Sequence, residues 1–157
     1  YFTLCMHADP VGTTTASLVA PLPAERSPAW AVWVGFGSPC IGIFLPVYLD
    51  GVLPAAFAAG GEHDEGALRP SLWWSFHRLH TAASRDFARN LPRARAAWLE
   101  VEAWIESERA LLERDCRALH ARGERSQAAQ CSSAFMDQVA ERVMERADSL
   151  ACELGGD

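Results

Sequence analysis

The feature that most constrains the fold is a change in residue type along the chain. Up to about residue 60 the sequence is rich in Val, Thr, Trp, Phe, Pro and Gly, whereas from Ser71 onward Ala, Arg, Glu and Leu dominate. The first set favours strands and the second favours helices. The order predicts an α+β fold with segregated elements. We expect an antiparallel β segment over 1–60, an acidic loop over 61–70 and a helical region over 71–157.

The β segment contains four candidate strands separated by turn residues. They span residues 2–8, 13–20, 30–36 and 41–49. The connections are short, which favours antiparallel pairing in a meander. Both faces of the third strand are apolar, so we expect both to be covered. Pro46 is expected to interrupt the fourth strand.

The helical region divides at residues that begin or end helices. Ser71 is a candidate N-cap for a helix over 72–89, in which Trp73 and Trp74 are expected to anchor the helix on the sheet. Asn90 is expected to cap the next helix, with Pro92 in its first turn. That helix is expected to end before Gly123.

Two apolar stripes at three- and four-residue spacing mark the last two helices. The stripe residues are Trp98, Val101, Ile105, Leu112, Cys116 and Leu119, and then Phe135, Val139, Val143, Ala147, Leu150 and Leu154. The second of these helices is expected to run from about Ser126 to Gly155. Two amphipathic helices joined by a tight turn predict an antiparallel hairpin.

Charge and cysteine usage narrow the class of protein. The net charge is −6, which argues against a general nucleic-acid or anionic-membrane binder. The sequence contains no lysine, which we interpret as a composition bias and not as a binding signal. Glycines and prolines interrupt the most apolar stretch, 29–59, before it reaches the ~20 residues of a membrane span. Five scattered cysteines without a C-x-x-C pair indicate neither a disulfide framework nor a zinc site, and they predict a cytoplasmic protein. The opening residues carry no signal-peptide pattern and look like the middle of a strand, so we expect the polypeptide to continue upstream.

Four stretches together resemble the C-terminal half of the secernin-like dipeptidases. They are CMHA (5–8), TTTASLVAPLP (13–23), the run WVGFGSPCIGIFLPV (33–47) and SLWWSFHRLH (71–80). The resemblance covers about the first 80 residues, and the helical remainder agrees only in its general residue composition. It implies an N-terminal-nucleophile (αββα) hydrolase fold, in which two antiparallel sheets stack between helical layers.

The resemblance also implies a reaction. In these enzymes an N-terminal Cys attacks an amide carbonyl and its own α-amine acts as general base, while backbone N–H groups and a side-chain amide stabilise the oxyanion. Position 1 is Tyr1, so we expect the nucleophile upstream, no catalytic residue in this chain, and no activity of the chain alone. Some relatives place a basic residue soon after a Ser-Pro turn, but here the next arginine after Ser38-Pro39 is Arg69. The chain is therefore expected to supply pocket wall for a small peptide substrate, without cofactor or metal.

The candidate pocket residues are His7, Thr14, Ser38 and Cys40. His7 is expected near a strand end, where it could line the mouth of the sheet, although Cys5 and His7 are more simply explained as a buried thiol beside a polar side chain. Thr14 could instead reflect β-propensity alone. Ser38 and Cys40 flank Pro39 at a turn that a ligand could approach, or that is simply tight.

Two other interpretations of the sequence remain open. His77 and His80 lie three apart on a helix and, with the acidic residues of 62–65, could be imagined as a metal site, but a hydrated loop gives no convergent ligands. The second interpretation is a non-catalytic secernin-like protein that binds partners through the helical hairpin. It predicts unusual apolar exposure on the last two helices. A homo-oligomer, including one formed through the hairpin alone, also stays open.

Overall fold

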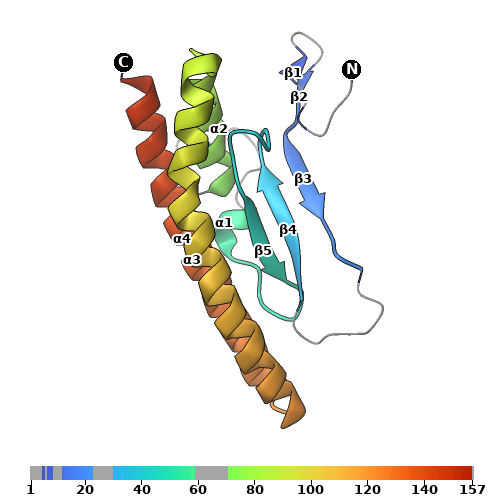
Figure 1. Ribbon diagram of the computed structural model, residues 1–157. Coiled ribbons are helices and arrows are strands. Elements are labelled where there is room, and N and C mark those ends of the chain that lie inside the picture. The colour runs from blue at the N-terminus through green and yellow to red at the C-terminus, as the bar shows by residue number, and fades with distance from the viewer. Residues whose placement is uncertain (1–4, 6, 9–11, 23–29, 59–70, 157) are drawn as a thin grey trace.

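The computed structural model describes residues 5, 7–8, 12–22, 30–58 and 71–156. Within them the chain is α+β, as predicted: a three-stranded antiparallel sheet lies beside a long helical hairpin (Figure 1). The acidic loop expected over 61–70 falls outside the described residues.

The strands form a meander preceded by a small hairpin. β1 (His7–Ala8) pairs with β2 (Gly12–Thr13), and β3 (Ala16–Val19), β4 (Ala31–Phe36) and β5 (Phe44–Tyr48) form a sheet in the order β3-β4-β5. All these pairs are antiparallel. The single strand expected over 13–20 is therefore divided between two sheets.

Pro46 lies inside β5, so the expected interruption is wrong. Gly37 N donates to Thr15 O at 2.7 Å, which makes those two residues a hydrogen-bonded pair of the β3–β4 ladder. Because such pairs alternate along an antiparallel ladder, Trp33 directs its backbone groups toward β3 and not toward Pro46, its partner in β5. Proline at this position therefore removes no ladder bond.

Burial falls steadily across the sheet from β5 to β3. Four of the five residues of β5 are buried, β4 is mostly half-buried, and three of the four residues of β3 are exposed. Figure 1 shows the same order, with β5 next to the hairpin and β3 farthest from it. The covering of both faces that was predicted for the strand over 30–36 thus holds only in part, whereas β5 is the most buried strand of the sheet.

The helices begin with one short turn and a helix packed on the hairpin. α1 (Ala55–Ala58) places Phe57 edge-on to Phe36 of β4, and α2 (Leu72–Ser84) stacks Phe76 on the same ring. Trp74 is 44% exposed, so the expected Trp anchors are wrong for this residue. The buried face of α2 is formed instead by Leu72, Ser75, Phe76, Leu79, Ala82 and Ala83.

The break between α2 and α3 (Phe87–Ala121) lies at Asp86, not at Asn90 as expected. The Asp86 carboxylate caps α3 by accepting from Arg89 N at 3.2 Å. Asn90 is buried inside α3, where its amide donates to Ala82 O and Ala83 O, both at 3.5 Å. It thereby adds a donor for carbonyls in the last turn of α2, where Ala82 O also accepts from Arg85 N at 3.4 Å.

The two long helices form the predicted antiparallel hairpin. α3 ends at Ala121, the chain turns at Gly123, which has a φ of +80°, and α4 (Arg125–Gly155) returns along α3. Eleven of the twelve predicted stripe residues are buried, and Leu112 is half-buried. The helical period of the sequence therefore located the hairpin core.

A polar cluster attaches the hairpin to the face of the sheet that carries Tyr48 and Trp33. Tyr48 OH donates to Glu113 Oε1 at 3.0 Å, and Arg109 donates to the same oxygen at 2.6 Å. The Arg109 guanidinium lies 5.8 Å from the ring centroid of Trp33. The charged pair itself lies within α3, and the Tyr48 hydroxyl and the Trp33 ring connect it to the sheet, so the cluster helps to fix how the hairpin sits on the sheet.

None of the helices in the described part of the chain has the length and apolar character needed to cross a membrane.

Candidate functional site

The connection between β4 and β5, residues 37–43, gathers most of the unusual chemistry of the described structure. Gly37 takes a φ of +70°, a conformation that side chains rarely adopt, and so allows the sharp turn. Ser38 O then accepts from Ile41 N at 3.1 Å and from Gly42 N at 3.2 Å. The turn is thus a compact, internally bonded loop.

Helices α2 and α3 both contact this turn. Trp98 of α3 is fully buried and its indole Nε1 donates to Ile41 O at 2.7 Å. Arg95, one turn earlier, donates to Gly42 O at 2.9 Å. A Cβ on Gly42 would lie 3.1 Å from the Phe76 ring, so the backbone approaches α2 more closely than most residues would permit.

Ser38, a predicted pocket residue, is almost completely buried, with 2% of its surface exposed. Its hydroxyl oxygen has no hydrogen-bond partner among the described residues. A buried hydroxyl without a partner is unfavourable, by about 1–3 kcal/mol. The turn therefore carries a polar group whose bonding capacity this part of the chain does not use.

Cys40, two residues later, lies against the Cys5 thiol, with which it shares a hydrogen bond. Burial first, and the Cys5 contact second, raise the pKa of Cys40 to about 12. The charge of Arg95 acts weakly in the opposite direction. Because the thiolate is the reactive form, Cys40 is a poor nucleophile at neutral pH.

The other two predicted residues lie on the neighbouring hairpin. His7 pairs with Thr13 in the β1–β2 ladder, but its side chain is outside the described part of the structure. Thr14 is half-buried in the two-residue link between β2 and β3. The hydrogen bond from Gly37 N to Thr15 O joins this link to the β4–β5 turn. Thr14, Ser38 and Cys40 therefore lie at the same end of the sheet.

Sequence reasoning missed Arg95 as the cation of this site. The sequence has no basic residue shortly after the Ser-Pro turn, where the resemblance would place one. The structure brings Arg95 to Gly42 from a helix 53 positions further along the chain. No local sequence pattern indicates such a contact. The only signal is that Arg95 stands among alanines of an amphipathic helix.

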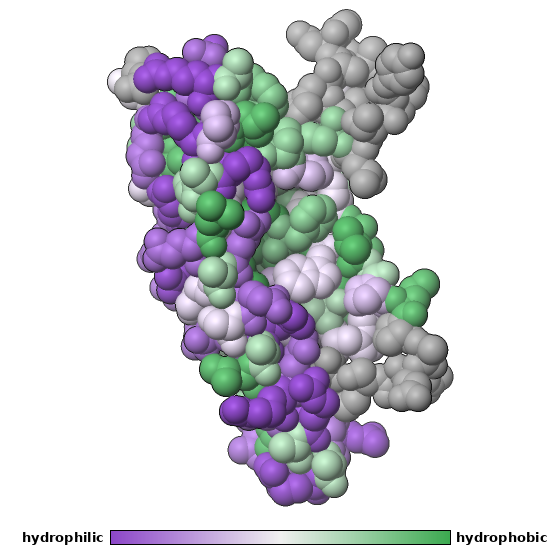
Figure 2. All heavy atoms as spheres, in the orientation of Figure 1, coloured by the Kyte–Doolittle hydropathy of each residue, from purple (hydrophilic) through white to green (hydrophobic). Residues whose placement is uncertain are grey.

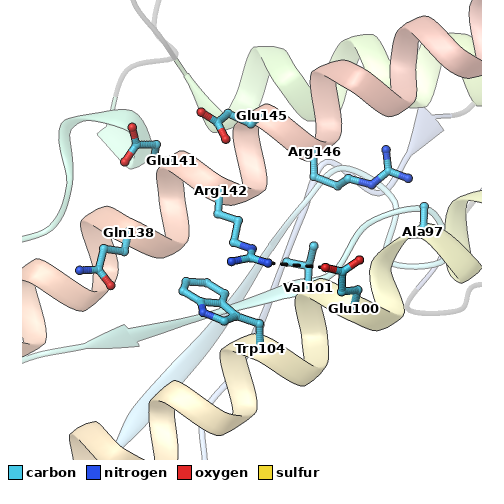
Figure 3. A pocket seen from close by; sticks show the side chains of 9 residues that line it. All are labelled: Ala97, Glu100, Val101, Trp104, Gln138, Glu141, Arg142, Glu145 and Arg146. Carbon is cyan, nitrogen blue, oxygen red and sulfur yellow. Dashed lines mark ion pairs between the residues drawn. The ribbon is translucent and has the colours of Figure 1, made fainter.

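A hollow in the surface lies between α3 and α4 and has a volume of about 580 Å³. Its lining residues are Ala97, Glu100, Val101, Trp104, Gln138, Glu141, Arg142, Glu145 and Arg146. Figure 3 shows Arg142 reaching across it, 4.5 Å from the Trp104 centroid and 3.8 Å from Glu100. The groove is open, and Arg142 at its centre already contacts Trp104 and Glu100, so this groove is the weaker candidate for a functional site.

Two of the remaining predictions concern metal ions and the helical surface. His77 is exposed on α2 and packs edge-on to Trp74, and no group of three metal-ligating side chains occurs within the described residues.

On α3 and α4 the exposed large apolar residues of the described chain are Leu99 and Leu111. They lie roughly 18 Å apart along the helix axis, so they do not form one patch.

Comparison of the chain with protein-family models, with curated proteins and with solved structures finds no significant match.

Proposed function

We propose that this chain is the sheet-completing and helical part of a cysteine-type N-terminal-nucleophile amide hydrolase, a dipeptidase or related amidase. The nucleophile lies on a segment outside the sequence described here, and the end of the sheet at Ser38 and Cys40 forms pocket wall. The observation that carries the proposal is the uncovered outer strand β3.

β3 has a free backbone edge among the described residues. The alternation of ladder pairs directs the N–H groups of Ser17 and Val19 toward β4 and those of Ala16 and Leu18 away from it. Leu18 is 65% exposed and Val19 is 54% exposed, although their side chains lie on opposite faces of the sheet. An apolar strand exposed on both faces and along one edge is poorly suited to solvent.

The opposite edge of the sheet is already covered. Tyr48 N, which points away from β4, donates to Met136 Sδ of α4 at 3.3 Å. Pro46 next to it has no N–H to offer. Among the described strands, β3 is therefore the one beside which a further strand could extend the sheet. The resemblance implies that the nucleophile opens the first strand of the domain, and we propose that this strand pairs with β3.

The reactivity of the described groups agrees with a nucleophile that lies elsewhere. The raised pKa of Cys40 keeps its thiol protonated near neutrality. An N-terminal cysteine needs no such side-chain base, because an α-amine with a pKa near ~7.7–8.0 accepts the thiol proton. The described residues would then form part of the wall of the substrate pocket.

The alternative, partner binding through the helical hairpin, has less support. It calls for a contiguous apolar surface on α3 and α4, whereas Leu99 and Leu111 are isolated. Figure 2 shows the visible face of the hairpin as mostly hydrophilic, with the green surface concentrated over the sheet. The apolar exposure thus favours completion of the sheet.

The direct test is hydrolysis of dipeptides by the longer polypeptide that the proposal requires. Replacing its N-terminal Cys with Ser and with Ala is expected to abolish turnover in the Ala variant and to reduce it strongly in the Ser variant. The 157-residue chain alone is expected to be inactive. Undiminished hydrolysis in both variants would remove the proposed mechanism.

A matched pair of proline variants tests the role of β3 separately. Leu18→Pro removes only an outward N–H, so it is expected to leave the 157-residue chain folded and to impair the longer polypeptide. Val19→Pro removes an N–H directed at β4 and is expected to destabilise both. Equal stability and activity of the longer Leu18→Pro protein would contradict the pairing at this edge.

A further inference from the structure

Two cysteines that are distant in sequence meet at the site end of the sheet. Cys5 lies just before β1 and Cys40 lies in the β4–β5 turn, and their thiols share a hydrogen bond. Both residues are half-buried. Neither belongs to a helix or strand, so a small movement of either sulfur breaks no ladder bond.

The contact joins two parts of the fold that otherwise belong to different sheets. β1 and β2 form their own two-stranded ladder, whereas the turn at Cys40 connects strands of the main sheet. The backbone bond from Gly37 N to Thr15 O, 2.7 Å long, holds the turn against the link that follows β2. Continued by two residues, the register that pairs His7 with Thr13 sets Cys5 opposite Thr15, so this bond places the turn that carries Cys40 beside Cys5.

We propose that Cys5 and Cys40 form a redox pair, which a small disulfide oxidant such as oxidised glutathione converts into an intramolecular disulfide. Each thiol gives up its proton, and the pair gives up two electrons as the Cys5 Sγ–Cys40 Sγ bond forms. The S–S bond of oxidised glutathione breaks and takes up the two electrons and two protons, which yields two molecules of reduced glutathione. The inference does not depend on the proposed hydrolase activity.

The consequence is a covalent link between the β1–β2 hairpin and the pocket turn. The two sulfurs must approach to about 2.05 Å for the bond to form. Ser38 is in the same turn, so the link would limit the movement open to its unpartnered hydroxyl. Oxidation would thereby fix the wall of the site.

The remaining cysteines supply internal controls. Cys116 is buried at the hairpin tip, where its thiol lies 3.7 Å from Ala128 O, and Cys131 packs beside it. Cys152 is exposed on α4. If oxidation merely followed exposure, Cys152 would react first, and if it followed helix proximity, Cys116 and Cys131 would be linked.

The test is disulfide mapping of the 157-residue protein after equilibration in glutathione redox buffers. Because the chain has no lysine, trypsin cuts it only after arginine, and Cys5 and Cys40 fall in the separate peptides 1–26 and 27–78. We expect these two peptides to be recovered as one species, lighter than their sum by two hydrogen atoms. Cys5→Ser and Cys40→Ser should each abolish that species, and Cys152→Ser should leave it unchanged.

Several outcomes would overturn the inference. One is that Cys5 and Cys40 both remain free thiols in fully oxidising buffer. Another is that the peptides of Cys116 and Cys131 are linked to each other in preference to those of Cys5 and Cys40. The third is that unfolded protein gives the Cys5–Cys40 species in the same abundance as folded protein. The wild-type map decides the matter even if a serine variant fails to fold. The raised pKa of Cys40 makes attack slow at neutral pH, so the equilibrium and not the initial rate is the quantity to compare.

Discussion

Replacing Trp98 with Phe tests whether α3 holds the β4–β5 turn in place. Trp98 is fully buried, stacks on Phe76 at a centroid distance of 5.8 Å, and donates its indole N–H to Ile41 O at 2.7 Å. Phe keeps an aromatic ring for the stack but has no donor. The substitution therefore removes the hydrogen bond and leaves a small cavity.

The expected loss of stability follows from these two terms. A buried carbonyl that loses its donor raises the free energy of the fold by about 1–3 kcal/mol. Complete truncation of a buried Trp destabilises by about 3–5 kcal/mol, and Phe restores much of that volume, so the cavity adds roughly 1 kcal/mol. We expect the free energy of unfolding to fall by about 2–4 kcal/mol.

The assay is urea unfolding followed by far-ultraviolet circular dichroism, since Trp fluorescence itself changes with the substitution. The midpoint should fall by roughly 1–2 M with an unchanged slope. Trp74→Phe is the matched control: Trp74 is 44% exposed, and its replacement should change stability by less than about 0.5 kcal/mol. If Trp98→Phe costs less than about 1 kcal/mol, or no more than Trp74→Phe, the turn does not depend on this contact.

Two further predictions concern packing and pH. At Gly51 a Cβ would lie 2.7 Å from Met136 Cε and 3.1 Å from Ser133 N. Gly51→Ala should therefore lower the free energy of unfolding, measured in urea, by about 1–3 kcal/mol. Gly156→Ala is the control and should be close to neutral, because the nearest atom to its Cβ would be 3.4 Å away. Burial raises the pKa of Cys40 from 9.0 to about 12, and burial followed by the Glu113 carboxylate raises the pKa of Tyr48. Because the folded state holds these protons more tightly, the stability they contribute is fully present below about pH 9 and is lost as pH rises toward 12. Urea midpoints should fall over that range, less steeply in Cys40→Ser, and a flat profile would show that neither group is buried as described.

Much of the fold could be predicted because local sequence patterns determine it. The three- and four-residue spacing of apolar residues located both long helices, and Gly123 marked the turn between them. Short connections likewise predicted the antiparallel order of β3, β4 and β5. In each case the signal lies within a few residues of the feature it predicts.

The errors arose where distant residues decide between local alternatives. Asp86 and Asn90 are both capable of capping a helix, and only the carbonyls at the end of α2 select Asn90 for a buried role. Pro46 was expected to interrupt a strand because the direction of its missing N–H depends on the ladder register. Neither choice can be made from the adjacent sequence.

The site was predicted in part for the same reason. Ser38 and Cys40 are neighbours in sequence, so their shared turn was visible from the proline between them. The contact of Cys40 with Cys5 and that of Gly42 with Arg95 join residues far apart in the chain. Such contacts depend on how the sheet is seated against α3, which no short motif encodes.

The central claim is that the free edge of β3 pairs with another strand in a longer polypeptide. Amide hydrogen exchange of Leu18, measured by NMR, tests it most directly, because this N–H points away from β4 while those of Ser17 and Val19 point toward it. We predict rapid exchange of Leu18 in the 157-residue chain and slowing by at least about a hundredfold in the longer polypeptide, with Ser17 and Val19 slow in both. Rapid exchange of the Leu18 amide in both proteins would contradict the account.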